Sequence, residues 1–307
     1  MAEKRRAAYL DLAGKGELAG RARLLRAMLG KPCRLCPRHC RVDRREGQLG
    51  VCRTADRALV ASYGPHFGEE APLVGTGGSG TIFFANCVLR CVFCQNYEIS
   101  VLGEGGRPVE PPQLARIMLE LQDQGCHNIN LVTPTHVTPM ILEGLAIAAG
   151  DGLELPLVYN CGGYEELEVL GLLDGVVDIY MPDMKYADSG TAQRLSRAAD
   201  YPRRNRAAIR EMHRQVGDLA LDEDGVAYRG LLVRHLVLPG GLAGTGEIAR
   251  FLAEEISADT YVNIMAQYRP IHRARRFPPL DRMIGAGEFR EAVTLARDAG
   301  LHRFDVR

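Results

Sequence analysis

The 307-residue sequence has no net charge, no long apolar run and no apolar core near its start. Its 38 basic residues balance 38 acidic ones, so bulk electrostatics give no case for nucleic-acid or membrane binding. The longest apolar stretches, such as LEGLAIAAG, fall far short of the ~20 residues that span a membrane. The charged start, MAEKRRAAYLDLAGKGELAG, is unlike a secretory signal. We therefore expect a cytoplasmic protein without a membrane partner.

Cysteine is the one residue type whose distribution is unusual. Without an export signal, nine cysteines indicate a reducing compartment, where thiols are free to bind metal. Seven of the nine lie between Cys33 and Cys94. The remaining two, Cys126 and Cys161, are expected to be ordinary buried thiols. The overall composition, 46% hydrophobic and 25% charged, is typical of a globular enzyme.

The chain divides into three parts by pattern. Residues 1–78 combine a helical stretch over 1–31, interrupted by glycines, with a four-cysteine segment. We expect this segment to be a small subdomain held together by a bound metal. Residues 79–285 alternate strand and helix, and residues 286–307 form a final helix and tail. A hairpin with an Asp-Gly turn is expected over 218–230, and a helical stretch over 191–216 should break near Pro202.

Six strands alternate with helices in the central part. They are expected at 80–85, 128–133, 156–160, 177–183, 231–239 and 260–266. Such alternation predicts an α/β fold, with a parallel sheet and right-handed crossovers. Periodicity leaves open whether the sheet curls into a partial barrel. In either case, functional groups should gather at the carboxyl ends of the strands, just where the first strand runs into a cysteine-rich loop.

That loop reads NCVLRCVFCQNY and holds Cys87, Cys91 and Cys94, spaced C-x3-C-x2-C. Thiolates at this spacing can bind separate irons of a cubane cluster. Structural zinc normally needs four protein ligands, and the next cysteine downstream is the distant Cys126. A four-iron cluster held by three cysteines leaves one iron open for a small molecule, whereas zinc with a distant fourth ligand is the alternative.

The stretch CVLRCVFCQN resembles the signature of the radical S-adenosylmethionine superfamily, C-x3-C-x-aromatic-C, with Phe93 as the aromatic residue. The resemblance implies a partial (β/α)6 TIM-like barrel, here with a small cysteine-rich N-terminal subdomain. It implies a [4Fe–4S] cluster on Cys87, Cys91 and Cys94, whose open iron binds the methionine half of S-adenosylmethionine, with Phe93 near the adenine. It also implies an electron donor of the flavodoxin or ferredoxin type.

Further segments look most like the pyruvate formate-lyase activating enzyme branch. YMPDMKYAD is similar to that branch's D-x-K segment, which implies that Asp183 and Lys185 contact the methionine moiety. VRHLVLPG is similar to its segment ending in V-P-G, which implies that His235 lies near the cofactor ribose.

Two loops near the expected cavity depart from that pattern or fit it loosely. A Gly-Gly-Glu-like segment is usual after the second strand, but this chain reads LVTPTHVTP, so that Thr133, Thr135 and His136 are the candidates to bind the cofactor or act on substrate. Asn160, followed by two glycines, is a further candidate after the third strand, although a plain turn explains the same residues.

The N-terminal cysteines form a second set: Cys33, Cys36, Cys40 and Cys52, spaced C-x2-C-x3-C-x11-C. Four thiols so spaced predict a second metal site, either zinc or an auxiliary iron–sulfur cluster, in which His39 could replace one ligand. The arrangement resembles activase-related iron–sulfur proteins with a cysteine-rich N-terminal segment.

The reaction implied by the resemblance is reductive cleavage of S-adenosylmethionine to a 5′-deoxyadenosyl radical that abstracts hydrogen from a substrate. Three hypotheses remain at this point. The substrate is a small molecule or another macromolecule; or it is a protein activated by glycyl radical formation; or the chain is a non-catalytic zinc or iron–sulfur binding protein.

Overall fold

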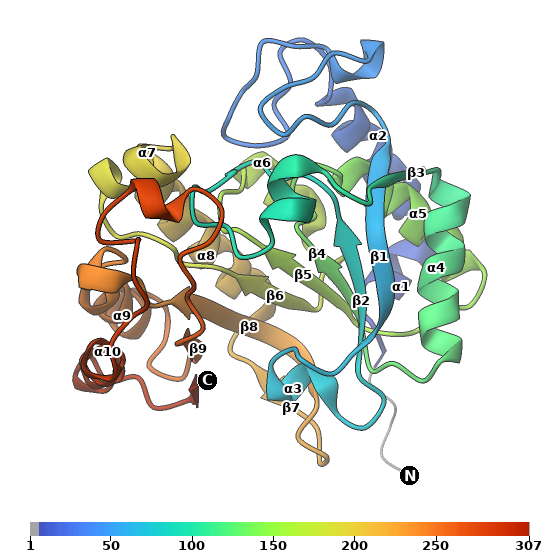
Figure 1. Ribbon diagram of the computed structural model, residues 1–307. Coiled ribbons are helices and arrows are strands. Elements are labelled where there is room, and N and C mark those ends of the chain that lie inside the picture. Colours follow the sequence, from blue (N-terminus) through green and yellow to red (C-terminus); the bar gives the residue numbers. More distant parts are fainter. Residues whose placement is uncertain (1–5, 307) are drawn as a thin grey trace.

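The computed structural model describes residues 6–306 as an α/β fold around one open, mostly parallel sheet of ten strands (Figure 1). The strand order is β10-β9-β8-β6-β5-β4-β2-β1-β3, with β7 paired to β8 beside this path. The strands are β1 Ala58–His66, β2 Ser79–Phe84, β3 Arg107–Val109, β4 Ile129–Val132, β5 Leu157–Cys161, β6 Ile179–Pro182, β7 Ala220–Leu221, β8 Ala227–Leu236, β9 Tyr261–Met265 and β10 Phe304–Val306.

Helices connect the strands. The α-helices are α1 Tyr9–Gly14, α2 Glu17–Ala27, α3 Ala71–Val74, α4 Pro111–Asp123, α5 Thr138–Gly150, α6 Leu167–Leu173, α7 Ser189–Ser196, α8 Tyr201–Val216, α9 Thr245–Phe251 and α10 Ala286–Asp298. Short 3-10 turns occur at Arg44–Glu46, Pro239–Gly241 and Ala274–Arg276, and π-helical turns at Glu98–Leu102 and Leu252–Ile256. No helix within residues 6–306 is long and apolar enough to cross a membrane.

The six strands predicted from the sequence are confirmed as β2, β4, β5, β6, β8 and β9, which run parallel to one another. The hairpin expected over 218–230 is confirmed by the antiparallel pairing of β7 with β8. The expected break near Pro202 is displaced: Pro202 lies in the first turn of α8, where its missing N–H has no helical partner to lose, and the chain breaks over 197–200.

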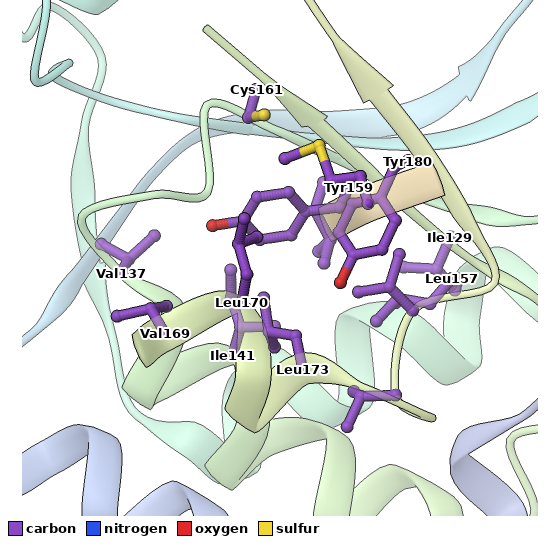
Figure 2. Close-up of a cluster of buried hydrophobic side chains, with 14 of the residues drawn as sticks. Ile129, Val137, Ile141, Leu157, Tyr159, Cys161, Val169, Leu170, Leu173 and Tyr180 are labelled. Carbon is purple, nitrogen blue, oxygen red and sulfur yellow. The ribbon is translucent and has the colours of Figure 1, made fainter. Parts of the chain in front are cut away.

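The main core lies between the sheet and helices α5 and α6. Figure 2 shows Leu157, Tyr159 and Tyr180 from β5 and β6 facing Ile141 and Leu170 from the two helices. The two tyrosine rings meet edge to face, with centroids 5.9 Å apart. Because side chains alternate along a strand, the residues between these point to the other face of the sheet.

On that other face, a small apolar cluster fills the end of the sheet where the strands begin. Val158, Ile179 and Leu232 pack there against Leu73 of α3. Figure 1 shows α3 at the bottom of the view, with α7 at the opposite end of the molecule. Toward the carboxyl ends of the strands, polar residues such as Asn160 and Arg234 join apolar ones on the inward face, and a cavity opens among them.

The N-terminal residues are built into the same body. β1 pairs antiparallel with β2, and Arg26 of α2 forms an ion pair with Glu143 of α5. The hydroxyl of Tyr9 donates to the Leu153 carbonyl at 3.2 Å. This packing holds the four-cysteine segment, blue in Figure 1, at the top of the view, the same end as α7.

Candidate metal and cofactor site

A cavity of about 560 Å³ lies at the carboxyl ends of the parallel strands. Five strands each contribute inward-facing or terminal residues to its wall, which include Val132, Asn160, Asp183, Arg234, Leu236 and Met265. The position agrees with the expectation that chemistry in such a sheet sits beyond the strands' carboxyl ends.

The loop after β2 forms one side of this cavity. Cys87, Cys91 and Cys94 all line it, together with Phe93, whose ring packs edge to face on Tyr186 at 6.1 Å between centroids. Left-handed backbone at Asn86 and Arg90, with φ of 73° and 51°, turns this loop tightly. The thiol of Cys91 accepts a hydrogen bond from the Ser196 hydroxyl at 3.0 Å. The sequence motif is therefore folded onto a cavity wall.

The surroundings of two of these three thiols disfavour their ionised forms. Burial, followed by the charge of Cys91, raises the pKa of Cys87, and burial raises that of Cys94 to about 12. All nine cysteines lie within the described residues and are free thiols. No group of three or more Cys, His, Asp or Glu side chains within residues 6–306 is arranged to hold a metal ion. Cysteine binds a metal as the thiolate, so any metal bound by Cys87 and Cys94 would have to displace their protons.

A fourth cysteine, Cys161, borders the same cavity but is engaged elsewhere. Its side chain belongs to the main core and is hydrogen bonded to Glu165. Burial, then the charge of Glu165, raises the pKa of the Cys161 thiol well above its ordinary value. Cys161 is thus a buried neutral thiol at the end of β5. Cys126 is likewise buried in the main core.

A partly buried charge network centred on Asp183 also lines the cavity. Its carboxylate accepts from Lys185 Nζ at 2.6 Å and from Arg234 Nε at 3.1 Å. Burial alone would raise the pKa of Asp183, but the charges of Arg234 and Lys185 lower it. The pKa of Lys185 is raised by Asp183 against the effect of burial. Arg234 also approaches Glu70, with 3.9 Å between Nη1 and Oε1.

Five of the predicted cofactor residues line the cavity: Phe93, Thr133, Asn160, Asp183 and Lys185. Two neighbours in the proline-rich loop lie behind the wall instead. The Thr135 hydroxyl donates to Glu165 at 2.7 Å, and a ring nitrogen of His136 lies 2.9 Å from the Ala85 carbonyl oxygen. Burial, then the charge of Arg44, lowers the pKa of His136 to about 3, so the ring is neutral.

His235 also lies away from the cavity. Arg234 and Leu236 line the cavity, so the alternation of β8 turns His235 to the opposite face. There its Nδ1 lies 2.7 Å from the Met184 carbonyl oxygen and its Nε2 lies 2.9 Å from the Thr245 hydroxyl. The ring thus ties β8 to the start of α9 and holds the D-x-K segment by its backbone.

The four N-terminal cysteines lie close to one another. Burial raises the pKa values of Cys36 and Cys52, and the charges of the other cysteines in the set add to it. The Cys33 amide donates to the Cys40 carbonyl at 2.9 Å, which closes the first turn of the segment. His39 is paired with Glu166, 2.7 Å away, rather than turned toward the thiols. The segment thus brings the four thiols near one another without arranging three of them around a metal ion, and the second metal stays a prediction.

The two cysteine sets are joined by Arg38, which lies between Cys36 and Cys40 in the sequence. Its Nε donates to the Val88 carbonyl at 2.8 Å, and its Nη2 donates to the Ser196 carbonyl at 2.7 Å and the Leu89 carbonyl at 3.4 Å. Cys36 and Cys52 share one apolar cluster with Cys91 and Phe93. The N-terminal segment therefore braces the three-cysteine loop directly.

Sequence reasoning missed several polar residues of the cavity wall: Arg90, Gln95, Arg234, Gln267 and Arg269. Two of these residues could have been predicted from the sequence. Arg90 lies inside the cysteine motif, and the alternation of side chains along its strand places Arg234 on the cavity face. Gln95, Gln267 and Arg269 lie in loops, whose path no periodicity predicts.

Comparison with known proteins gives one informative match. No family model matches the chain. Over 281 residues the chain is 32% identical to the uncharacterized protein MJ0674 of Methanocaldococcus jannaschii, and the match covers 88% of this chain and 76% of that protein.

Proposed function

The chain belongs to the same family as MJ0674, and from the geometry of its cavity we propose that it is a radical S-adenosylmethionine enzyme. The observation that carries the proposal is that Cys87, Cys91 and Cys94 line one cavity with Phe93 and the partly buried Asp183–Lys185 pair. These are the groups that the resemblance assigns to a [4Fe–4S] cluster and to S-adenosylmethionine, and they come from separate parts of the chain.

When bound, the cluster and S-adenosylmethionine would together supply a 5′-deoxyadenosyl radical that abstracts hydrogen from substrate. The chain's own residues would bind and orient these two groups. The three cysteine thiolates would hold the cluster, and the Asp183–Lys185 pair would hold the charged methionine half. Phe93 would pack near the adenine, while Thr133 and Asn160 offer hydrogen bonds from the strand ends.

The fold supports this assignment in its finer form as well. We propose that β2, β4, β5, β6, β8 and β9 with their helices form a partial (β/α)6 barrel, with α3 filling its lower end. In a curled sheet the inward side chains of all six strands converge. This curvature would explain why residues from both halves of the sheet line the same cavity.

The N-terminal cysteines would bind a second metal, zinc or an iron–sulfur cluster. Arg38 links this segment to the backbone of the three-cysteine loop, so loading of the second metal would also order the first site. Reduction of the cluster would come from a flavodoxin- or ferredoxin-type donor.

Production of 5′-deoxyadenosine tests the proposal. The protein is reconstituted anaerobically with iron and sulfide, reduced with dithionite and given S-adenosylmethionine. We expect 5′-deoxyadenosine from the wild type and from Cys126→Ala, whose thiol is buried away from the cavity, and none from Cys91→Ala. A cluster-free visible spectrum without product, or full activity in Cys91→Ala, would overturn the assignment.

A glycyl radical enzyme activase is the second candidate, favoured by the similarity of the Asp183–Lys185 segment to the activating-enzyme branch. It predicts a glycyl radical signal on a partner protein after turnover, detected by electron paramagnetic resonance. A non-catalytic zinc or iron–sulfur protein, the third hypothesis, predicts no nucleoside product with either site loaded.

A further inference from the structure

The charges around the cavity are matched in its depth but not at its rim. Inside, Lys185 and Arg234 share the carboxylate of Asp183, and Arg234 also faces Glu70. At the rim, Arg90 and Arg269 line the cavity, and neither has an acidic partner or a side-chain hydrogen bond within residues 6–306. Two unpaired guanidinium groups therefore face a space large enough for a small molecule.

Arg269 is held in place through its backbone. Gln95 Oε1 accepts from the Arg269 amide, and Gln95 Nε2 donates to the Arg269 carbonyl, both at 3.1 Å. The same Nε2 donates to the Phe93 carbonyl at 2.8 Å. The chain thus fixes the Arg269 backbone to the cysteine loop while leaving its exposed guanidinium unused, which is a preorganised arrangement for a ligand.

Arg90 is a more demanding case, because part of its guanidinium is buried. Its Nη1 is inaccessible to solvent and has no hydrogen-bond partner among the described residues. A buried donor without an acceptor costs about 1–3 kcal/mol, more for a charged group, and an anionic oxygen would remove that cost.

We propose that Arg269 and Arg90 form an oxyanion-binding site at the rim of the cavity, which takes a phosphate or carboxylate group of a small-molecule substrate. That the ligand is a substrate rests on the proposed function, and the inference adds that this substrate carries an anionic phosphate or carboxylate group. Guanidinium groups suit it because their planar donors match the oxygens of both groups in pairs. The inner Asp183–Lys185 pair stays available for the cofactor.

Three ring compounds that differ in one group serve as probes: phenyl phosphate, benzoate and the neutral benzamide. Each is titrated calorimetrically into the reconstituted full-length protein with S-adenosylmethionine present. We expect one saturable site for at least one anion and none for benzamide, and the stronger anion tells phosphate from carboxylate. Binding should weaken at least tenfold in Arg269→Gln and in Arg90→Gln.

Arg290→Gln is the matched control, since Arg290 is an exposed arginine of α10 that does not line the cavity, and its binding should equal the wild type. The proposal is overturned if neither anion binds, if Arg269→Gln binds as tightly as Arg290→Gln, or if an anion binds only in a parallel titration without S-adenosylmethionine. Anion binding without 5′-deoxyadenosine formation would refute the proposed reaction and leave the site intact.

Discussion

Replacing Arg38 by alanine should destabilise the protein and loosen the three-cysteine loop. The change removes hydrogen bonds to the Val88 and Ser196 carbonyls, at 2.8 and 2.7 Å. It also removes a longer one to Leu89 and one to the exposed Arg197 carbonyl, both of which contribute less. It also removes a cation–π contact with the Tyr164 ring at 5.3 Å. Val88, Leu89 and Ser196 are buried, so water replaces the lost donor poorly.

The expected loss follows from these contacts. Two hydrogen bonds from a charged donor contribute about 1.5 kcal/mol each, and the longer bond and the ring contact add less. Because Arg38 is itself only partly buried, we expect a loss of about 3 kcal/mol in the free energy of unfolding.

Urea unfolding of the reconstituted protein measures the loss, with Arg41→Ala as control. Arg41 lies in the same segment and is exposed, so its replacement should change stability by less than about 0.5 kcal/mol. Arg38→Ala should also retain less iron after gel filtration. The reasoning is refuted if the two variants unfold at the same urea concentration and retain equal iron.

Three further changes test other parts of the site. The pKa of Glu165 is raised to about 7, mainly by burial, so the free energy of unfolding should fall by about 3 kcal/mol as pH rises from about 4.5 to 7. Glu165→Gln should flatten this pH dependence, measured as urea midpoints. An unchanged slope would contradict the raised pKa of Glu165. Asp183→Asn should cost about 2 kcal/mol, because the partly buried Lys185 and Arg234 both lose their counter-charge. A loss under about 0.5 kcal/mol in urea unfolding would show that solvent screens these ion pairs. Gly163→Ala should yield little folded protein in a solubility assay, because a Cβ there would lie 2.3 Å from the Asp183 carbonyl at a φ of 69°, whereas Gly171→Ala, with open space in α6, should fold normally.

The strands of the central sheet could be predicted because buried parallel strands read as short apolar runs between helices of strong period. The strands at the two ends of the sheet could not. β3 and β10 have only three residues each, and β10 fell in the predicted tail. Their existence depends on pairing with distant segments, β1 and β9, which local sequence does not encode.

The candidate site was predictable where side chains belong to a motif or a strand end. Cys87, Phe93 and Asp183 are of this kind, and all three line the cavity. The resemblance alone predicts His235 near the cofactor. In the structure its neighbour Arg234 faces the cavity, so the alternation of side chains along β8 directs His235 to the opposite face of the sheet. The rim arginine Arg269 depends on how Gln95 anchors an irregular loop, which is a tertiary contact across 174 positions of sequence.

An open sheet has two edges, and both are poor templates for further pairing. β3 is three residues long and exposes Arg107 beside Pro108, which has no N–H to offer a neighbour. β10 is equally short. A strand from a second molecule would find three residues at β10 and three at β3, one of which lacks an N–H. Beyond β3, residues 61–66 of β1 also form the edge, and Pro65 interrupts their hydrogen-bonding groups. The fold can leave its sheet open, as a cavity requires, without inviting the edge-to-edge aggregation to which open sheets are prone.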